Sequence, residues 1–453
     1  MEPTAPSHGV DSRKHTPNAN QHASNANQQP YSVPDRWTNL DELAAPSPVE
    51  NVADAPIHHT SLEAARSQDQ NRTRSANIGL AALDEDVPKD ASQLRRVSAR
   101  ATQLYTISHL VFFSLLGTLA RLGLTALTRY PNAPVIFSTV WANFGGSLVM
   151  GFLAEDRALF RQEWGTLPVQ VGTDANRVGT SQDAAAAEAA KKAHLATKKT
   201  IPLYIGLATG FCGSFTSFSS FVRDIFLAMS NDLVAPGPGQ SVAVGRNGGY
   251  SFMAMLAVII ATLALSLGGL VIGAHVAIAW APMMPVIPYK FSRRLADPLV
   301  VLVAWGCWLG AVLLSIFPPH DFWRGRATFA LVFAPPGCLL RFYLSLLLNA
   351  KAKAFPLGTF TANILGTALL AMAWDLAHGQ VGGVGGCQVL QGIQDGFCGC
   401  LTTVSTWVAE LNGLQRRSAH VYGVASVAVA FALTVIIMGG MRWTRGFDSL
   451  LCH

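Results

Sequence analysis

The stretch Gly210-Phe-Cys-Gly-Ser-Phe-Thr-Ser-Phe-Ser-Ser-Phe221 decides the fold, because it places glycine and hydroxyl groups inside an apolar run. It returns in altered form as Gly396-Phe-Cys-Gly-Cys-Leu-Thr-Thr-Val-Ser-Thr-Trp407. Glycine weakens a helix and hydroxyls compete for backbone hydrogen bonds, so each copy predicts a helix broken at membrane depth. A bilayer tolerates such a break only where it faces protein or a water-filled path. Two broken helices in two repeats therefore point to a transport site.

The composition is that of a polytopic membrane protein, since 50% of the 453 residues are hydrophobic and only 13% are charged. The net charge of +6 is better explained by basic cytoplasmic loops than by nucleic-acid binding. The seven cysteines show no metal-binding spacing, and we interpret them as buried thiols. The spans lack a catalytic triad and a phosphate-binding loop, which argues against an enzyme.

The apolar segments predict an all-α fold with nine spans. Residues 1–102 are polar and predict a disordered cytosolic tail. A cytoplasmic insert at about 155–200 interrupts the first repeat (103–280), a linker with span five covers 281–325, the second repeat is 326–441, and 442–453 form a short C-terminal tail. The predicted spans lie at 103–128, 133–154, 201–229, 252–280, 297–317, 326–349, 356–378, 390–411 and 418–441.

Basic residues predict the orientation of the chain, because cytoplasmic loops are enriched in Lys and Arg. They gather before span one and after spans two, four, six and eight, and the loop at 379–389 carries no charge. The N-terminus is therefore expected in the cytoplasm and the C-terminus outside. These basic residues are Arg95, Arg96, Arg100, Arg157, Arg161, Lys191, Lys192, Lys198, Lys199, Lys290, Arg293, Arg294, Lys351, Lys353, Arg416 and Arg417.

An internal duplication is visible in the spacing of polar residues. Arg121 and Asn143 are 22 residues apart, as are Arg341 and Asn363, and the broken-helix motif recurs 186 residues later. With one linking span between two sets of four, the second set enters the membrane from the opposite face. The sequence thus predicts two inverted four-span repeats, each with a broken third helix.

The duplicated polar residues allow two interpretations each. Asn143 and Asn363 are either interhelical hydrogen-bonding groups or pore-lining amides that present N–H groups to an anion. Arg121 and Arg341 lie within spans, where a cation is costly. They either pair with a carboxylate or reach the interface, or they attract an anion near a vestibule.

Aromatic and hydroxyl side chains follow each break. Phe218 and Phe221 lie on one helical face and serve either as core or as ring edges, which are weakly positive and can contact an anion. The second copy carries Val404 and Trp407 at these positions. Hydroxyls that can satisfy the freed backbone or line a path are Thr216, Ser217, Ser219, Ser220, Thr402, Thr403, Ser405 and Thr406.

These motifs resemble the fluoride channel family of the Fluc or CrcB type and its duplicated fungal form, the fluoride export proteins. The resemblance rests on the two glycine-to-hydroxyl stretches and the paired Arg and Asn residues, and covers about 103–280 and 326–441. It implies a passive, selective fluoride channel of the plasma membrane whose single chain supplies both halves of an antiparallel dimer. The chain would then work as a monomer, with fluoride and the lipid bilayer as its partners.

The same resemblance assigns roles to residues. Asn143 and Asn363 would be pore asparagines, Phe218 and Phe221 the ring pair that contacts fluoride, and Arg121 and Arg341 would lie at vestibule mouths. A structural sodium ion would be held by the backbone of Gly213, Thr216, Gly399 and Thr402. Because the second copy lacks the Phe pair, one of two pores would be degenerate. The competing hypotheses are a coupled small-anion transporter and a non-transporting membrane scaffold.

Overall fold

The structure is a computed structural model that describes residues 99–137, 139–156, 158–160, 198–233, 245–288, 291–318, 320 and 323–452. Most of the predicted cytosolic tail and of the insert at about 155–200 lies outside these residues. The described residues contain helices and no β-strand, so the predicted all-α class is confirmed.

Seven helical stretches of the described chain are long and apolar enough to cross a membrane. Their positions confirm a polytopic membrane protein. They are Ala99–Thr128, Pro202–Ser230, Gly248–Met283, Ser292–Ile316, Phe329–Lys351, Leu357–His378 and Arg416–Thr444.

The helices follow the predicted repeats in order. The first repeat comprises α3 (Ala99–Thr128), α4 (Thr139–Glu155), α7 (Pro202–Ile205), η4 (Gly206–Cys212), α8 (Gly213–Phe215), α9 (Phe218–Ser230) and α10 (Gly248–Trp280). The linking elements are η5 (Ala281–Met283), η6 (Ser292–Ala296) and α12 (Asp297–Ile316). The second repeat comprises η7 (Arg324–Thr328), α14 (Phe329–Leu348), η8 (Asn349–Lys351), α15 (Leu357–His378), α16 (Gly383–Gly392), η9 (Ile393–Cys398), α17 (Gly399–Leu401), α18 (Ser405–Gly413) and α19 (Arg416–Thr444).

Two of the nine predicted spans are not among these seven stretches. The span expected at 133–154 is α4, which has only 17 residues. The span expected at 390–411 is divided among α16, η9, α17 and α18, and the chain leaves the helix between α17 and α18. The count of nine spans and the inverted relation of the repeats therefore stay predictions.

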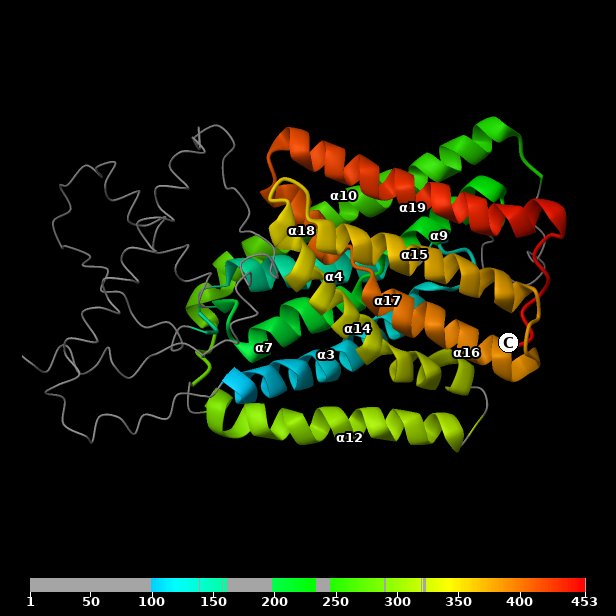
Figure 1. The fold of residues 1–453 in the computed structure, drawn as a ribbon. Coiled ribbons are helices and arrows are strands. Elements are labelled where there is room, and N and C mark those ends of the chain that lie inside the picture. The colour runs from blue at the N-terminus through cyan, green and yellow to red at the C-terminus, as the bar shows by residue number, and fades with distance from the viewer. Residues whose placement is uncertain are drawn as a thin grey trace, which may run out of the picture.

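The helices form one bundle in which the first helices of the two repeats are neighbours. Helix α3 packs against both α12 and α14, α10 packs against α4, and α15 packs against α19. Figure 1 shows α12 along one side of the bundle and α19 along the opposite side, and its colours run in opposite directions along α3 and α14. This antiparallel arrangement is the one expected of inverted repeats.

Local signals in the sequence explain where several helices begin and end. Pro202 stands at the first position of α7, where its missing N–H costs no helical hydrogen bond. Asn247 caps α10, since its side chain accepts from the backbone N–H of Tyr250 at 2.9 Å. Helix α9 ends at Asn231, which takes the left-handed conformation with φ of 63°.

The linking helix α12 is held by polar contacts as well as apolar packing. His109 Nε2 of α3 lies 3.7 Å from Asp297 Oδ1, and both side chains are fully buried. Trp305 Nε1 donates to Ser108 Oγ at 3.2 Å, and Trp308 Nε1 donates to a backbone carbonyl of α14 at 3.0 Å. The linking helix is therefore attached to the first helix of each repeat.

Candidate functional site

Each broken helix has the same sequence of local structures. A π-helical segment, η4 or η9, leads into a short helix that ends in an extended threonine, Thr216 with ψ of 153° or Thr402 with ψ of 155°. In the first repeat the next residue, Ser217, caps α9, since its Oγ accepts from the N–H of Ser220 at 3.2 Å. In the second repeat α18 begins one residue later, after Val404, and Thr403 Oγ1 accepts from the N–H of Thr406 at 3.4 Å. The predicted breaks are thus present, and π-helical turns such as those before them are frequent at functional sites.

The two breaks contact each other through their threonine hydroxyls. Thr216 Oγ1 accepts from the backbone N–H groups of Val404 and Ser405, both at 3.1 Å. Thr402 Oγ1 accepts from the backbone N–H of Ser219, also at 3.1 Å. Each half therefore satisfies backbone donors that the break in the other half leaves free.

The serine hydroxyls repeat this exchange. Ser405 Oγ donates to the carbonyl of Cys212 at 3.1 Å, and Ser219 Oγ donates to the carbonyl of Cys398 at 3.4 Å. Such reciprocal contacts between equivalent residues are what a two-fold axis generates. They support the predicted duplication, although the two sequences differ at many positions.

The candidate asparagines brace the breaks of their own halves. Asn143 Oδ1 accepts from the N–H of Ser217 at 2.9 Å, and its amide nitrogen lies 3.5 Å from that residue's carbonyl. In the same way, Asn363 Oδ1 accepts from the N–H of Thr403 at 2.8 Å, and Asn363 Nδ2 donates to the carbonyl of Thr403 at 3.2 Å. Both side chains are fully buried. Each amide nitrogen carries a second N–H, so bracing and anion contact are compatible roles.

The candidate arginines lie at the contact between the halves, where they are 3% and 2% exposed. Arg121 Nε donates to the carbonyl of Ser214 at 3.0 Å, and its Nη2 donates to the carbonyl of Asp395. Arg341 makes the equivalent pair of bonds, since its Nε donates to the carbonyl of Cys400 and its Nη2 to that of Thr209, both at 2.8 Å. This buried position differs from the expected place at a vestibule mouth.

Each guanidinium also lies against the glycine of the opposite half. A Cβ on Gly213 would stand 2.3 Å from Nη1 and Nη2 of Arg341, and one on Gly399 would stand 2.4 Å from those of Arg121. No other residue type fits there without displacing a buried cation. The sequence predicted these glycines as breakers of the helix, and the structure adds a steric reason for them.

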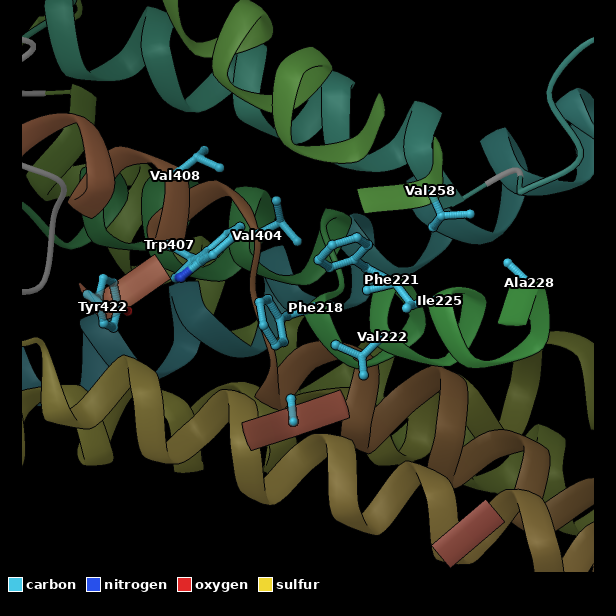
Figure 2. Close-up of a cluster of buried hydrophobic side chains, with 11 residues drawn as sticks. Phe218, Phe221, Val222, Ile225, Ala228, Val258, Val404, Trp407, Val408 and Tyr422 are labelled. Atoms are coloured by element: carbon cyan, nitrogen blue, oxygen red, sulfur yellow. The ribbon is translucent and has the colours of Figure 1, made fainter. Parts of the chain in front are cut away.

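The candidate phenylalanines belong to a buried aromatic group drawn from both halves. Phe218 lies edge-on to Phe221, with ring centroids 5.7 Å apart, and edge-on to Trp407 at 5.2 Å. Figure 2 shows Phe218 between the side chains of the two halves, with Val404 close to Trp407. The expected ring pair is brought together, and a third ring from the second repeat joins it.

The remaining hydroxyl candidates stay within their own halves. Ser220 Oγ accepts from Ser217 Oγ at 2.9 Å, and Thr406 Oγ1 accepts from Thr403 Oγ1 at 3.4 Å. Ser217 and Thr403, which the sequence also offered as hydroxyls for the freed backbone, accept from the N–H groups of Ser220 and Thr406.

Oxygen atoms are the groups that could hold a metal near the breaks. The described residues contain no group of three or more His, Cys, Asp or Glu side chains placed to bind a metal ion. The short helices before Thr216 and Thr402 end there, however, and the last carbonyls of a helix lack helical partners. Such oxygen donors suit a hard cation.

The interpretation of all seven cysteines as buried thiols was wrong for three of them. Cys387, in the middle of α16, and Cys452, near the C-terminus, form a disulfide with Cα atoms 5.7 Å apart, and Cys307 is exposed. Cys212, Cys338, Cys398 and Cys400 are buried free thiols, as expected.

Comparisons with known proteins agree with the motifs. The family described as CrcB-like protein, Camphor Resistance (CrcB), matches residues 109–274 and 328–440. "Fluoride export protein 1" of Neurospora crassa is 55% identical over 93% of this chain and 85% of its own length. "Fluoride export protein 1" of Candida albicans is 36% identical over 77% of this chain and 83% of its own length.

A shorter bacterial relative matches only a part of the chain. "Fluoride-specific ion channel FluC" of Desulfovibrio desulfuricans is 35% identical over 102 residues, which are 22% of this chain and 78% of that protein. No solved structure gives a significant match.

Proposed function

The chain belongs to the CrcB-like family, and we propose on this basis that it is a passive, selective fluoride channel that exports fluoride across the plasma membrane. The observation that carries the proposal is the pair of facing breaks, where amide, hydroxyl and aromatic groups of both halves meet in the interior of the bundle. A small, strongly hydrated anion needs such close N–H, O–H and C–H donors in place of its water shell.

The residues divide into a frame and a lining. Thr216, Thr402 and the two arginines join the halves and hold the breaks in place. Asn143, Asn363 and Phe218 would contact the ion, with the ring supplying its weakly positive edge. The negative-inside membrane potential would drive the anion outward without a coupling reaction. One chain carries both halves, so a monomer suffices.

We propose a structural sodium ion among the backbone oxygens of Gly213, Thr216, Gly399 and Thr402. These residues belong to or directly follow the short helices, whose last carbonyls lack helical partners and would supply the oxygen ligands that a hard cation takes. A cation there would lower the cost of placing an anion in a low-dielectric interior. Exchange of sodium for N-methylglucamine should lower the melting temperature of the purified chain; an unchanged value would contradict a resident sodium ion.

We propose that the C-terminus faces the exterior and the N-terminus the cytoplasm. The disulfide between Cys387 and Cys452 supports this orientation, because disulfides persist in oxidising compartments and are rare in the cytosol. Labelling of an epitope tag at the C-terminus in intact cells tests it, and labelling only after permeabilisation would reverse the orientation.

The decisive experiment is fluoride efflux from liposomes that hold the purified chain, followed with a fluoride electrode under a potassium diffusion potential. Rapid fluoride loss that follows the voltage, without chloride loss, is the expected result. Efflux that requires a proton or cation gradient would identify a coupled transporter instead. A folded chain without any efflux would favour a scaffold.

A further inference from the structure

Trp407 occupies the position in the second repeat that Phe221 occupies in the first, 186 residues earlier. It lies on α18, is 2% exposed, and its ring stands edge-on to Phe218 of the opposite half at a centroid distance of 5.2 Å. The second repeat has therefore kept an aromatic ring at this position. The replacement adds one group that phenylalanine lacks, the indole N–H.

The indole N–H of Trp407 has no hydrogen-bond partner in the described part of the chain. More than nine in ten buried polar groups are paired, so an unpaired buried donor calls for an explanation such as a water or an ion. Figure 2 shows the indole nitrogen on the side of the ring that faces Tyr422. The Tyr422 hydroxyl donates to Glu410 Oε2 at 2.7 Å and does not accept from the indole N–H.

The neighbouring acid does not take the indole proton either. Glu410 accepts from the Tyr422 hydroxyl through Oε2 and from the Thr359 hydroxyl through Oε1 at 2.6 Å. Each oxygen accepts from a hydroxyl, and neither accepts from the Trp407 N–H, which is left for another acceptor. This buried donor belongs to a ring that contacts Phe218, a residue of the proposed path.

We propose that Trp407 Nε1–H donates a hydrogen bond to the permeating anion, on the side of its ring that faces Tyr422. This rests on the proposed fluoride conduction and deepens it. Hydrogen bonds to charged acceptors are shorter and stronger than neutral ones, and a rigid indole offers its proton without rearrangement. The path lined by Phe218 then combines a ring edge from the first half with an N–H donor from the second, and its preference for a small anion depends on Trp407.

The first test is fluoride efflux by Trp407→Phe, which keeps an aromatic ring and removes the donor together with part of the ring's volume. The fluoride concentration at half-maximal flux should rise about 10-fold to 100-fold, the factor expected for loss of a hydrogen bond to a charged group. Trp305→Phe is the matched control, because it removes an indole N–H that donates to Ser108 at the contact of α12 and α3. Unchanged or increased efflux in Trp407→Phe would overturn the proposal.

The second test reads the N–H itself by nuclear magnetic resonance of the chain labelled with 15N-tryptophan. The chain has ten tryptophans, and the resonance missing from Trp407→Phe, or from Trp407→Tyr should the first variant not fold, identifies the donor. Fluoride should shift this resonance downfield while equal chloride leaves it in place. A resonance insensitive to fluoride would mean that the N–H binds water only, and the proposal would fail.

The two readouts separate this inference from the proposed function. If the wild-type chain conducts fluoride but the Trp407 resonance does not respond, the channel function stands and the role of Trp407 as a donor is refuted. If the resonance shifts but no efflux occurs, the anion site at Trp407 stands and the channel function is refuted.

Discussion

The substitution Gly213→Ala tests how the two halves are joined. The new Cβ would stand 2.3 Å from both Nη atoms of Arg341, which is far inside van der Waals contact. The guanidinium cannot move away without losing hydrogen bonds, because Nε donates to the carbonyl of Cys400 and Nη2 to that of Thr209, both at 2.8 Å. Either the arginine gives up these bonds or the break moves away from it.

The cost follows from those two bonds and the added volume. A hydrogen bond to a charged group contributes about 1.5–3 kcal/mol, and overpacking a core costs about 1–3 kcal/mol. The loss of one bond with some relaxation gives about 3–6 kcal/mol, which corresponds to a fall in melting temperature of roughly 5–10 °C for a chain of this size. The measurement is thermal unfolding of the purified chain in detergent, followed by fluoride efflux, which should also be lost.

The matched control is Gly123→Ala on α3, where an added Cβ meets no heavy atom within 4 Å. This change should stabilise the helix by up to about 1 kcal/mol. Gly399→Ala should behave like Gly213→Ala, because Arg121 lies against it. If Gly213→Ala has the same melting temperature as the wild type or as Gly123→Ala, the guanidinium does not lie where the structure has it. The explanation for these glycines is then refuted.

Three further predictions concern the lining, the brace and the disulfide. Phe218→Ile should abolish fluoride efflux while Val404→Ala keeps it, because only the first residue brings a ring edge to the path; equal loss in both would contradict the unequal pores. Asn363→Ala should lower stability by about 1–3 kcal/mol, since a buried backbone N–H of the second break loses its acceptor, and an unchanged melting temperature would argue against the brace. Cys452→Ser should cost about 2–4 kcal/mol and remove the mobility difference between reduced and non-reduced chain on a gel, whereas a wild type that reacts with thiol reagents at Cys387 without reduction would show that the bond is not formed.

The sequence alone could predict the helices and the breaks because both depend on local properties. Apolar runs predict spans, and glycine followed by hydroxyls predicts the loss of helix at Thr216 and Thr402, which the structure confirms. The spacing of equivalent residues also predicted which positions correspond. The number of spans could not be predicted in the same way. It depends on whether α4 is long enough to cross the membrane, and its length of 17 residues depends on where the preceding loop ends.

Contacts between the halves could not be predicted, because a repeat offset says which residues are equivalent and not which ones face each other. Arg341 was expected at a vestibule mouth, yet it lies against Gly213 of the other repeat. The disulfide could not be predicted from the sequence for a related reason. Cys387 and Cys452 are 65 residues apart, and seven cysteines allow many pairings that spacing cannot distinguish.

The contacts that join the halves and the groups proposed to touch the anion have diverged to different degrees. The joining contacts run from hydroxyls and guanidinium groups to backbone atoms, as between Thr216 and the N–H of Ser405, and they are reciprocal in both halves. A backbone partner stays the same whatever side chain its residue carries, so these contacts tolerate sequence change. The ring contacts depend on the side chains themselves, so substitution changes them. The second repeat carries Val404 and Trp407 where the first carries two phenylalanines. A fused chain can therefore keep a symmetric frame while one path loses its ring and the other gains an N–H donor.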